Sequence, residues 1–195
     1  MPGKYSATIS KRVNGVVAPL AGPIDFQLRY VGPSPLPPAD LKLLVEFQKQ
    51  MTKLHRDLAA VQGTSREITT KLNQMKVILD QLPEAPAESR ERVRKLITNQ
   101  REIARKLNGD SVLRARNENV PMSIAERVGV ADDGTYLLTA KPTGTQREQF
   151  AIARKEVDDL SAALRKLTET DLKELETLLD KLGAPWTPGR LPAGK

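Results

Sequence analysis

The chain has 195 residues, of which 39% are hydrophobic and 28% charged, and this balance excludes both a membrane-embedded and a wholly disordered protein. Aromatic residues make up only 4%, so the core must be built from aliphatic side chains, which is typical of helix bundles. The absence of cysteine excludes disulfides and thiolate chemistry, and the net charge of +7 admits an anionic partner without requiring one.

Residues 1–31 are predicted to form a β-hairpin. Apolar and polar residues alternate in two runs, Tyr5–Val13 and Ile24–Val31. We expect Asn14-Gly15 and the stretch Ala18 to Pro23 to supply the turn. A two-stranded hairpin is marginal in water by itself. Its apolar face therefore needs a partner, which is either the helices of this chain or a sheet outside it. We favour the sheet, as part of a β-sandwich of which these are the last two strands.

Residues 32–39 are a proline-rich linker, after which a long helix is predicted over 40–82. Its apolar residues recur at spacings of three and four without a slip, and Gly63 does not interrupt their phase. Only one position of this seam is polar, and the pattern indicates a helix that packs along its whole length against other helices. The seam comprises Leu44, Phe47, Met51, Leu54, Leu58, Val61, Ser65, Ile68, Leu72, Met75, Leu79 and Leu82.

Two further long helices are expected over 87–107 and 145–182, which makes the fold mainly α: an up-down-up, coiled-coil-like bundle over 40–183. Residues 110–143 are predicted to be irregular except for a short helix near Ser123, where Ser123-x-x-Glu126 forms a capping box. A capping box is also expected at Thr145 and Glu148. The apolar phase shifts by one residue near Thr168, which predicts a kink or a second cap. Residues 184–195 are expected to be an irregular tail.

We predict no catalytic, cofactor-binding or metal-binding residues in this chain. His55 is the single histidine and has no second residue at a metal-ligand or relay spacing, so a structural or solvated role is favoured. The carboxylate pairs Asp132-Asp133 and Asp158-Asp159 are expected to solvate helix surfaces. No phosphate-binding or nucleophile motif occurs in the sequence, and no apolar run is long enough to span a membrane.

The densest basic run lies between Lys95 and Arg116 and contains no aromatic residue for stacking on bases. Nucleic acid is therefore an unfavoured partner, although a basic module that binds an anionic polymer remains the alternative function. Trp186 is expected to pack against the bundle end, with contact to a partner or a carbohydrate as the less favoured role. A self-associating coiled coil is also open. The residues singled out for interaction are Phe26, Tyr30, Trp186 and Arg190.

Several local motifs carry a resemblance to a known family. The hairpin motif is Tyr5-x-x-x-Ile9-x-Lys11-Arg12-Val13-x-Gly15-Val16-Val17-x-Pro19-Leu20. The later motifs are Leu113-x-Ala115-Arg116-Asn117-Glu118, Ser123-Ile124-Ala125-Glu126-Arg127-Val128, Pro142-Thr143-x-Thr145-Gln146-Arg147 and Ala184-Pro185-Trp186-Thr187-Pro188-Gly189-Arg190. In this order they resemble the C-terminal region of bacterial sortilin-like glycosyl hydrolases, which are Asp-box (BNR repeat) β-propeller proteins.

The resemblance implies a non-catalytic accessory module whose partners are an upstream β-sandwich and propeller. Asp boxes read roughly S-x-D-x-G-x-T-W, and Asp132-Asp133-Gly134-Thr135-Tyr136 imitates only part of one. The glycosidase activity of the family is therefore not carried onto any residue here. The abrupt start within an apparent sandwich fits a fragment or a split reading frame. Family analogy also implies export to the periplasm or the extracellular space.

Overall fold

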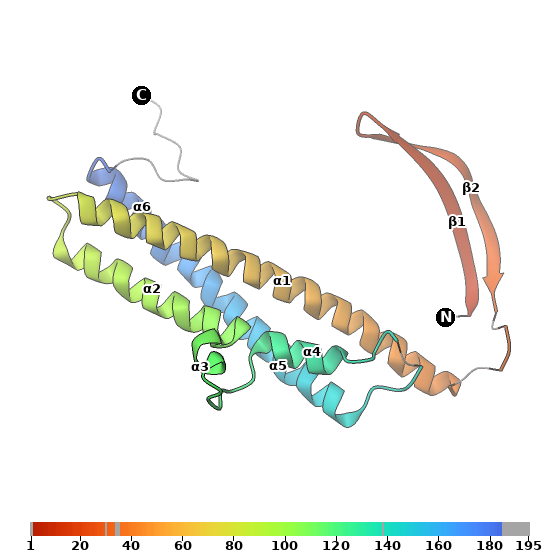
Figure 1. The fold of residues 1–195 in the computed structure, drawn as a ribbon. Coiled ribbons are helices and arrows are strands. Elements are labelled where there is room, and N and C mark those ends of the chain that lie inside the picture. Colours follow the sequence, from red (N-terminus) through yellow and green to blue (C-terminus); the bar gives the residue numbers. More distant parts are fainter. Residues whose placement is uncertain (1, 30, 34–35, 138, 185–195) are drawn as a thin grey trace.

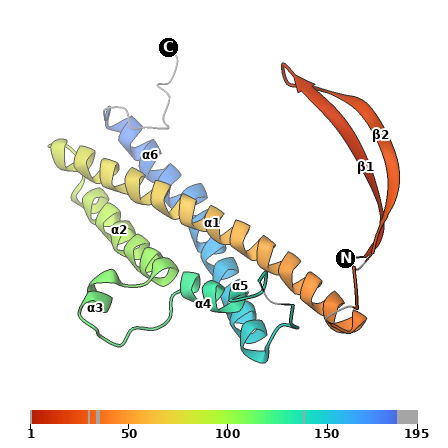
Figure 2. The ribbon, with the colours of Figure 1, turned by 45° about the vertical axis from the view of Figure 1, so that its right-hand side comes forward.

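The computed structural model describes residues 2–29, 31–33, 36–137 and 139–184. Two antiparallel strands, β1 (Gly3–Val13) and β2 (Val16–Leu28), precede a bundle of helices. The hairpin stands apart from the helices in both views of the ribbon (Figures 1 and 2). The chain is mainly α with an N-terminal hairpin, which confirms the predicted fold class.

The hairpin is longer and its turn tighter than the sequence indicated. Asn14 and Gly15 form the whole turn, with φ of 51° and 84°, as a type I′ turn requires. The prediction that residues 18–23 belong to the turn is wrong, because they lie within β2. Two prolines and a glycine in this stretch look like turn residues in sequence, yet β2 accommodates the stretch through two irregularities in its pairing with β1.

The helix α1 runs unbroken from Pro38 to Gln81, about 65 Å. Eleven of the twelve predicted seam positions are buried, and Leu82, just beyond the helix, is partly buried. Gly63 lies inside the helix without ending it. The heptad phase therefore correctly predicted both the continuity and the buried face of α1.

The second long helix, α2 (Ala87–Asn108), returns antiparallel to α1. Arg90 ties the two helices together at their connection, because its guanidinium donates hydrogen bonds to the carbonyl oxygens of Leu79 and Leu82 at 3.0 and 2.6 Å. On the inner side of α2 Gln100 is buried, whereas Ile103 is only partly buried.

Residues 110–143 hold two short helices, of which only the second was predicted. The first, α3 (Ser111–Ala115), is capped by Asp110, whose carboxylate accepts hydrogen bonds from two backbone N–H groups. The second, α4 (Ile124–Asp132), begins with the predicted Ser123–Glu126 capping box. Polar contacts then hold the following turn against α1, because the Tyr136 hydroxyl donates to the Gln48 carbonyl oxygen at 2.9 Å.

The third long helix is α5 (Gly144–Lys166), followed by a π-helical turn η1 (Leu167–Asp171) and α6 (Leu172–Lys181). Its capping box uses Thr143 and Gln146, so the predicted pair Thr145 and Glu148 is wrong by two positions. The threonine–glutamine pair satisfies the same two orphan N–H groups as the expected threonine–glutamate pair. The phase shift near Thr168 is absorbed by η1, where no side-chain cap forms.

A single apolar core joins these helices. Its buried residues run from Phe47 to Leu179 and none comes from the hairpin. Phe47 and Phe150 meet edge to face, with ring centroids 5.6 Å apart, at the end of α1 nearer the hairpin. The core therefore stabilises the bundle independently of β1 and β2.

Candidate functional site

The hairpin has a mostly apolar face, interrupted by Lys11 opposite Ala18, and a mostly polar face, on which Val17 lies opposite Arg12. Residues paired across an antiparallel ladder share a face, and alternate residues of a strand point to the same side. The pairs Tyr5–Phe26, Ala7–Ile24 and Val13–Val16 lie on one side of the hairpin. The apolar face, as we call it, comprises Tyr5, Ala7, Ile9 and Val13 of β1 with Val16, Ala18, Ala21, Ile24, Phe26 and Leu28 of β2.

The apolar face is exposed to solvent. Ile24 is 65% and Val16 70% exposed, and Ile9 at the middle of β1 is 63% exposed. The side chains of the bundle core, by contrast, are nearly all below a tenth exposed. Soluble proteins rarely expose contiguous apolar surfaces of this kind except at binding sites. The apolar face is therefore the candidate interaction surface among the residues that the structure describes.

Phe26 is the one predicted interaction residue within the described part of the chain, and it lies on this face near the open end of the hairpin. Its ring stacks on Tyr5 with centroids 6.0 Å apart, and the side chain remains 44% exposed. Tyr30, Trp186 and Arg190 lie outside the described residues. Sequence reasoning missed Val16 and Ala21 as members of the apolar face, because it assigned neither to a strand. The Asn14-Gly15 pair was the available signal, since a two-residue turn places Val16 directly opposite Val13.

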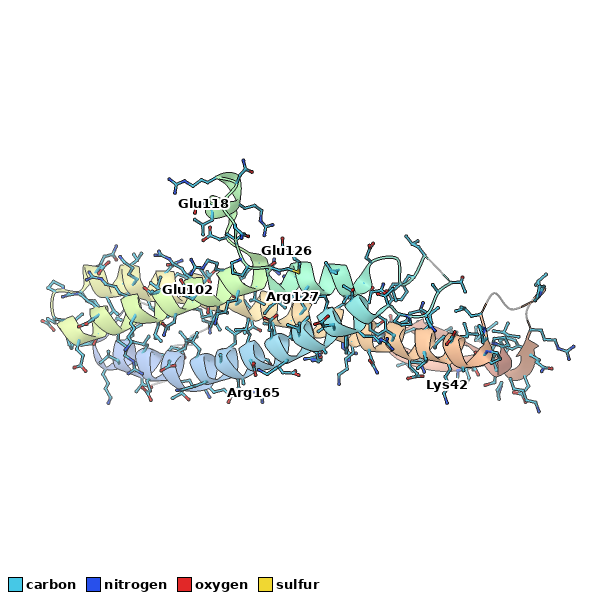
Figure 3. The ribbon with its side chains drawn as sticks, turned by 90° about the horizontal axis from the view of Figure 1, so that it is seen from below. Lys42, Glu102, Glu118, Glu126, Arg127 and Arg165 are labelled. Carbon is cyan, nitrogen blue, oxygen red and sulfur yellow. The ribbon has the colours of Figure 1, made fainter. Side chains whose placement is uncertain are left out.

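A cleft of about 560 Å³ lies where the end of α2 meets α3, α4 and α5. Apolar side chains form part of its wall, and charged side chains from α2, α4 and α5 surround them. Figure 3 shows Glu102, Glu126 and Arg127 near this junction and Glu118 on the segment that projects from the bundle. The apolar lining residues are Leu113, Val120, Met122, Ile124 and Leu160.

The charged groups around this cleft are engaged with one another. Arg127 pairs with Glu156 at 3.3 Å and donates a hydrogen bond to Gln149 at 2.9 Å. Arg105 pairs with Glu102 at 2.6 Å, and this hydrogen bond raises the pKa of the guanidinium. Asp110 accepts the backbone N–H of Leu113, which lowers the pKa of its carboxyl group. These groups serve caps and ion pairs, and none is poised as a general base.

Ser123 and Glu126, beside the same cleft, form a cap rather than a nucleophile and its base. The Ser123 backbone N–H and hydroxyl both donate to Glu126 Oε2, at 2.8 and 2.7 Å. The first of these bonds, together with the second, lowers the pKa of the Glu126 carboxyl group. A carboxylate stabilised in its ionised form is a poor acceptor for a serine proton.

Among the remaining titratable residues that the sequence singled out, Asp158 and Asp159 form ion pairs and His55 contacts Asp132. His55 Nε2 lies 3.1 Å from Asp132 Oδ2, which links α1 to α4. Asp158 pairs with Arg154, and Asp159 pairs with Lys155 at 2.8 Å. Within the residues that the structure describes, no group of three or more histidine, aspartate or glutamate side chains could hold a metal ion. No helix in the described ranges is long and apolar enough to cross a bilayer.

The basic run of α2 and α3 is partly neutralised in the fold. Arg105, Arg114 and Arg116 each pair with a carboxylate, Arg114 with Glu126 at 2.9 Å. Lys95, Arg101 and Lys106 are exposed on α2. Half of the predicted basic run is therefore engaged within the molecule, which weakens it as a binding stripe for an anionic polymer.

Comparison with known proteins yields no match to a protein-family model, a curated protein or a solved structure.

Proposed function

We propose that this chain is a non-catalytic interaction module, in which the hairpin docks by its apolar face onto a β-sheet and the helical bundle forms a rigid arm. The observation that carries the proposal is the solvent exposure of that face, with Ile24 65% and Phe26 44% exposed. A two-stranded sheet that buries neither face gains little stability from its strands alone. Docking onto a second sheet would bury the apolar residues about 10 Å from those of the partner, as in a sandwich.

The proposed parent is a sortilin-like propeller protein of the glycosyl hydrolase type, in which the partner sheet is a sandwich upstream of the hairpin. The local motifs quoted above support this part of the proposal. The helical arm would then contribute support to the parent or a further docking surface, and the catalytic or ligand-binding propeller would lie outside this chain.

Hydrogen exchange tests the proposal most directly. Amides of β1 and β2 are expected to exchange rapidly in the isolated chain, while amides of α1 exchange slowly because they lie in the packed core. In the native product purified from its source, the hairpin amides are expected to be protected. A monomeric isolated chain whose hairpin amides are protected as well as those of α1 would contradict the proposal.

The size of the native product separates the two ways in which the sheet could be supplied. An immunoblot with an antibody against this chain is expected to detect a band several times larger than 21.5 kDa if the sheet lies in the same polypeptide. A band of 21.5 kDa together with protected hairpin amides would instead indicate that a separate protein supplies it.

A further inference from the structure

We infer that the edge of β1 that faces away from β2 pairs with an acidic β-strand of the partner. This strand and the hairpin then form one layer of the sandwich, the apolar face packs on the opposing sheet, and β2 remains the outer edge. This inference rests on the proposed function and specifies which edge of the hairpin is used and the chemistry of the strand that it receives. It follows from the irregularities of β2, the regularity of β1 and the distribution of charge between the two strands.

The two strands differ in their ability to accept another strand. From the pair Ala7–Ile24 to the pair Ile9–Ala21, β1 advances two residues and β2 three. From Ile9–Ala21 to Ser10–Pro19, β1 advances one residue and β2 two. Both extra residues therefore lie in β2, and each interrupts the ladder and bends the strand that contains it.

Prolines add to the irregularity of β2. Pro19 and Pro23 have no N–H to donate, and within sheets proline is confined to edge strands, to bulges and to the first residue of a strand. Bulges and prolines are the devices that keep an edge from pairing. The strand β1 has neither, and from Ser6 to Val13 the backbone groups that do not bond to β2 point toward its other edge. A partner strand would therefore add beside β1.

The charges on β1 determine what kind of strand fits. Lys4, Lys11 and Arg12 are exposed, and β1 contains no acidic residue. Successive residues of a strand point to opposite sides, so Lys4 and Arg12 share the polar face, whereas Lys11 lies opposite Ala18 on the apolar face. Opposite charges directly across a ladder stabilise it, and like charges destabilise it. The strand that pairs with β1 is therefore expected to carry glutamate or aspartate on its polar face and apolar residues on the other.

In the register with the greatest overlap, the same charges disfavour a second copy of this chain as the partner. In an antiparallel pair of two β1 strands centred on Thr8, Lys4 of each copy would lie opposite Arg12 of the other. Both contacts are repulsive. Pairing with an acidic strand supplied by the partner avoids this repulsion and extends the apolar face by one strand.

The test uses the full chain and two synthetic peptides as long as β1. One alternates valine with glutamate and threonine, and the other has lysine in place of glutamate. Nuclear magnetic resonance with hydrogen exchange follows the backbone amides of β1 and β2. We expect the glutamate peptide at millimolar concentration to protect amides of β1 rather than β2, and the lysine peptide to bind at least about tenfold more weakly.

Charge reversal provides the matched comparison. The variant Lys4→Glu with Arg12→Glu is expected to reverse the preference, so that the lysine peptide binds about tenfold more tightly than the glutamate peptide. The control Lys53→Glu with Arg165→Glu changes the net charge equally at exposed helix positions, and Arg165 lies on the outer side of α5 (Figure 3). It is expected to keep the wild-type preference.

Three results would overturn the inference. They are failure of both peptides to protect β1, protection of β2 instead of β1, and binding that ignores the charge reversal. The last result, combined with loss of binding in Phe26→Asp, would leave docking through the apolar face standing while removing the pairing along β1. Failure of the proposed function is seen separately, as protection of the hairpin amides in the isolated monomer.

Discussion

At the scale of single residues, the most informative contact is that between Gln100 and Ser65 at the centre of the α1–α2 interface. Gln100 is 2% exposed, and its Nε2 donates to both the carbonyl oxygen and the hydroxyl of Ser65, each at 2.7 Å. Its Oε1 is buried without a hydrogen-bond partner. This contact gives the single polar residue of the α1 seam a hydrogen-bond partner and specifies which residues of the two helices face each other.

Replacement of Gln100 separates packing from hydrogen bonding. Gln100→Ala is expected to lower the free energy of unfolding by about 2–3 kcal/mol, because it leaves a cavity and an unpaired Ser65 hydroxyl. Gln100→Leu fills the same space and removes the unpartnered Oε1, so its unfolding free energy should stay within about 1 kcal/mol of the wild type. Denaturant unfolding measures both. Equal losses in the two variants would show that the hydrogen bonds dominate.

Glu126 makes stability depend on pH. Its hydrogen bonds with Ser123 lower the folded-state pKa below the ordinary value of 4.5. The carboxylate therefore contributes stability above pH 4.5, and this contribution is lost as the pH falls through the folded-state pKa. Thermal unfolding between pH about 6 and 3 is expected to show a smaller acid-induced fall in Tm for Glu126→Gln than for the wild type. Glu148→Gln, on the exposed side of α5, controls for the loss of one negative charge.

At the scale of elements, α1 and the η1 turn show how the helices keep one buried face. Along α1 the seam repeats at three and four residues, and this spacing keeps it facing the other helices. In the third helix, the buried Leu167 and Leu172 lie five positions apart, one more than the usual spacing of four. A π-turn widens the helix by one residue at that point, so that leucines on both sides of η1 face the same core.

Gly63 lowers the stability of α1, and a substitution to alanine is expected to remove this effect. An added Cβ would meet nothing within 4 Å, so alanine fits there without rearrangement. Gly63→Ala is expected to raise the free energy of unfolding by about 0.5–1 kcal/mol, because glycine loses more backbone entropy in a helix. Gly109→Ala is the contrasting variant, since φ is 84° there and a Cβ would lie 2.5 Å from the Arg114 guanidinium. Denaturant midpoints should shift in opposite directions, and a Gly63→Ala chain without gain would contradict the helix-interior assignment.

At the scale of the whole molecule, the bundle and the hairpin differ in where their apolar side chains lie. The bundle buries its apolar side chains within the chain, from Phe47 to Leu179. The hairpin satisfies much of its backbone through the β1–β2 ladder but leaves its apolar side chains in water. An independent core and an exposed amphipathic hairpin support the proposal of a module that docks through one end.

Deletion of residues 1–31 is therefore expected to leave the bundle folded. Because no core residue comes from the hairpin, the unfolding free energy of the remaining chain should change by less than about 0.5 kcal/mol. Circular dichroism during thermal unfolding measures this. A loss of several kcal/mol would mean that β1 and β2 pack on the helices and would remove the main support for docking elsewhere.

Much of the fold follows from local patterns. The heptad seam predicts α1 through Gly63, and Asn14-Gly15 is the part of the predicted turn that was correct, because both depend on the preferences of residues close in sequence. Ser123-x-x-Glu126 predicts the start of α4 for the same reason. The boundaries of β2 could not be read in this way, since Pro19, Gly22 and Pro23 favour turns locally and are held in a strand only by their pairing with β1.

The sequence by itself determined the helical bundle and the alternation of the hairpin, because periodicity and caps act over a few residues. Three features depend on tertiary packing. Gln100 contacts Ser65, thirty-five positions away, and the third helix accommodates its extra residue as a π-turn. Half of the cations in the basic run form ion pairs with carboxylates. The tertiary structure also decided that the apolar face of the hairpin lies in solvent, the observation on which the proposed function rests. Contacts between residues distant in the chain depend on how whole elements pack, and no local preference encodes that packing.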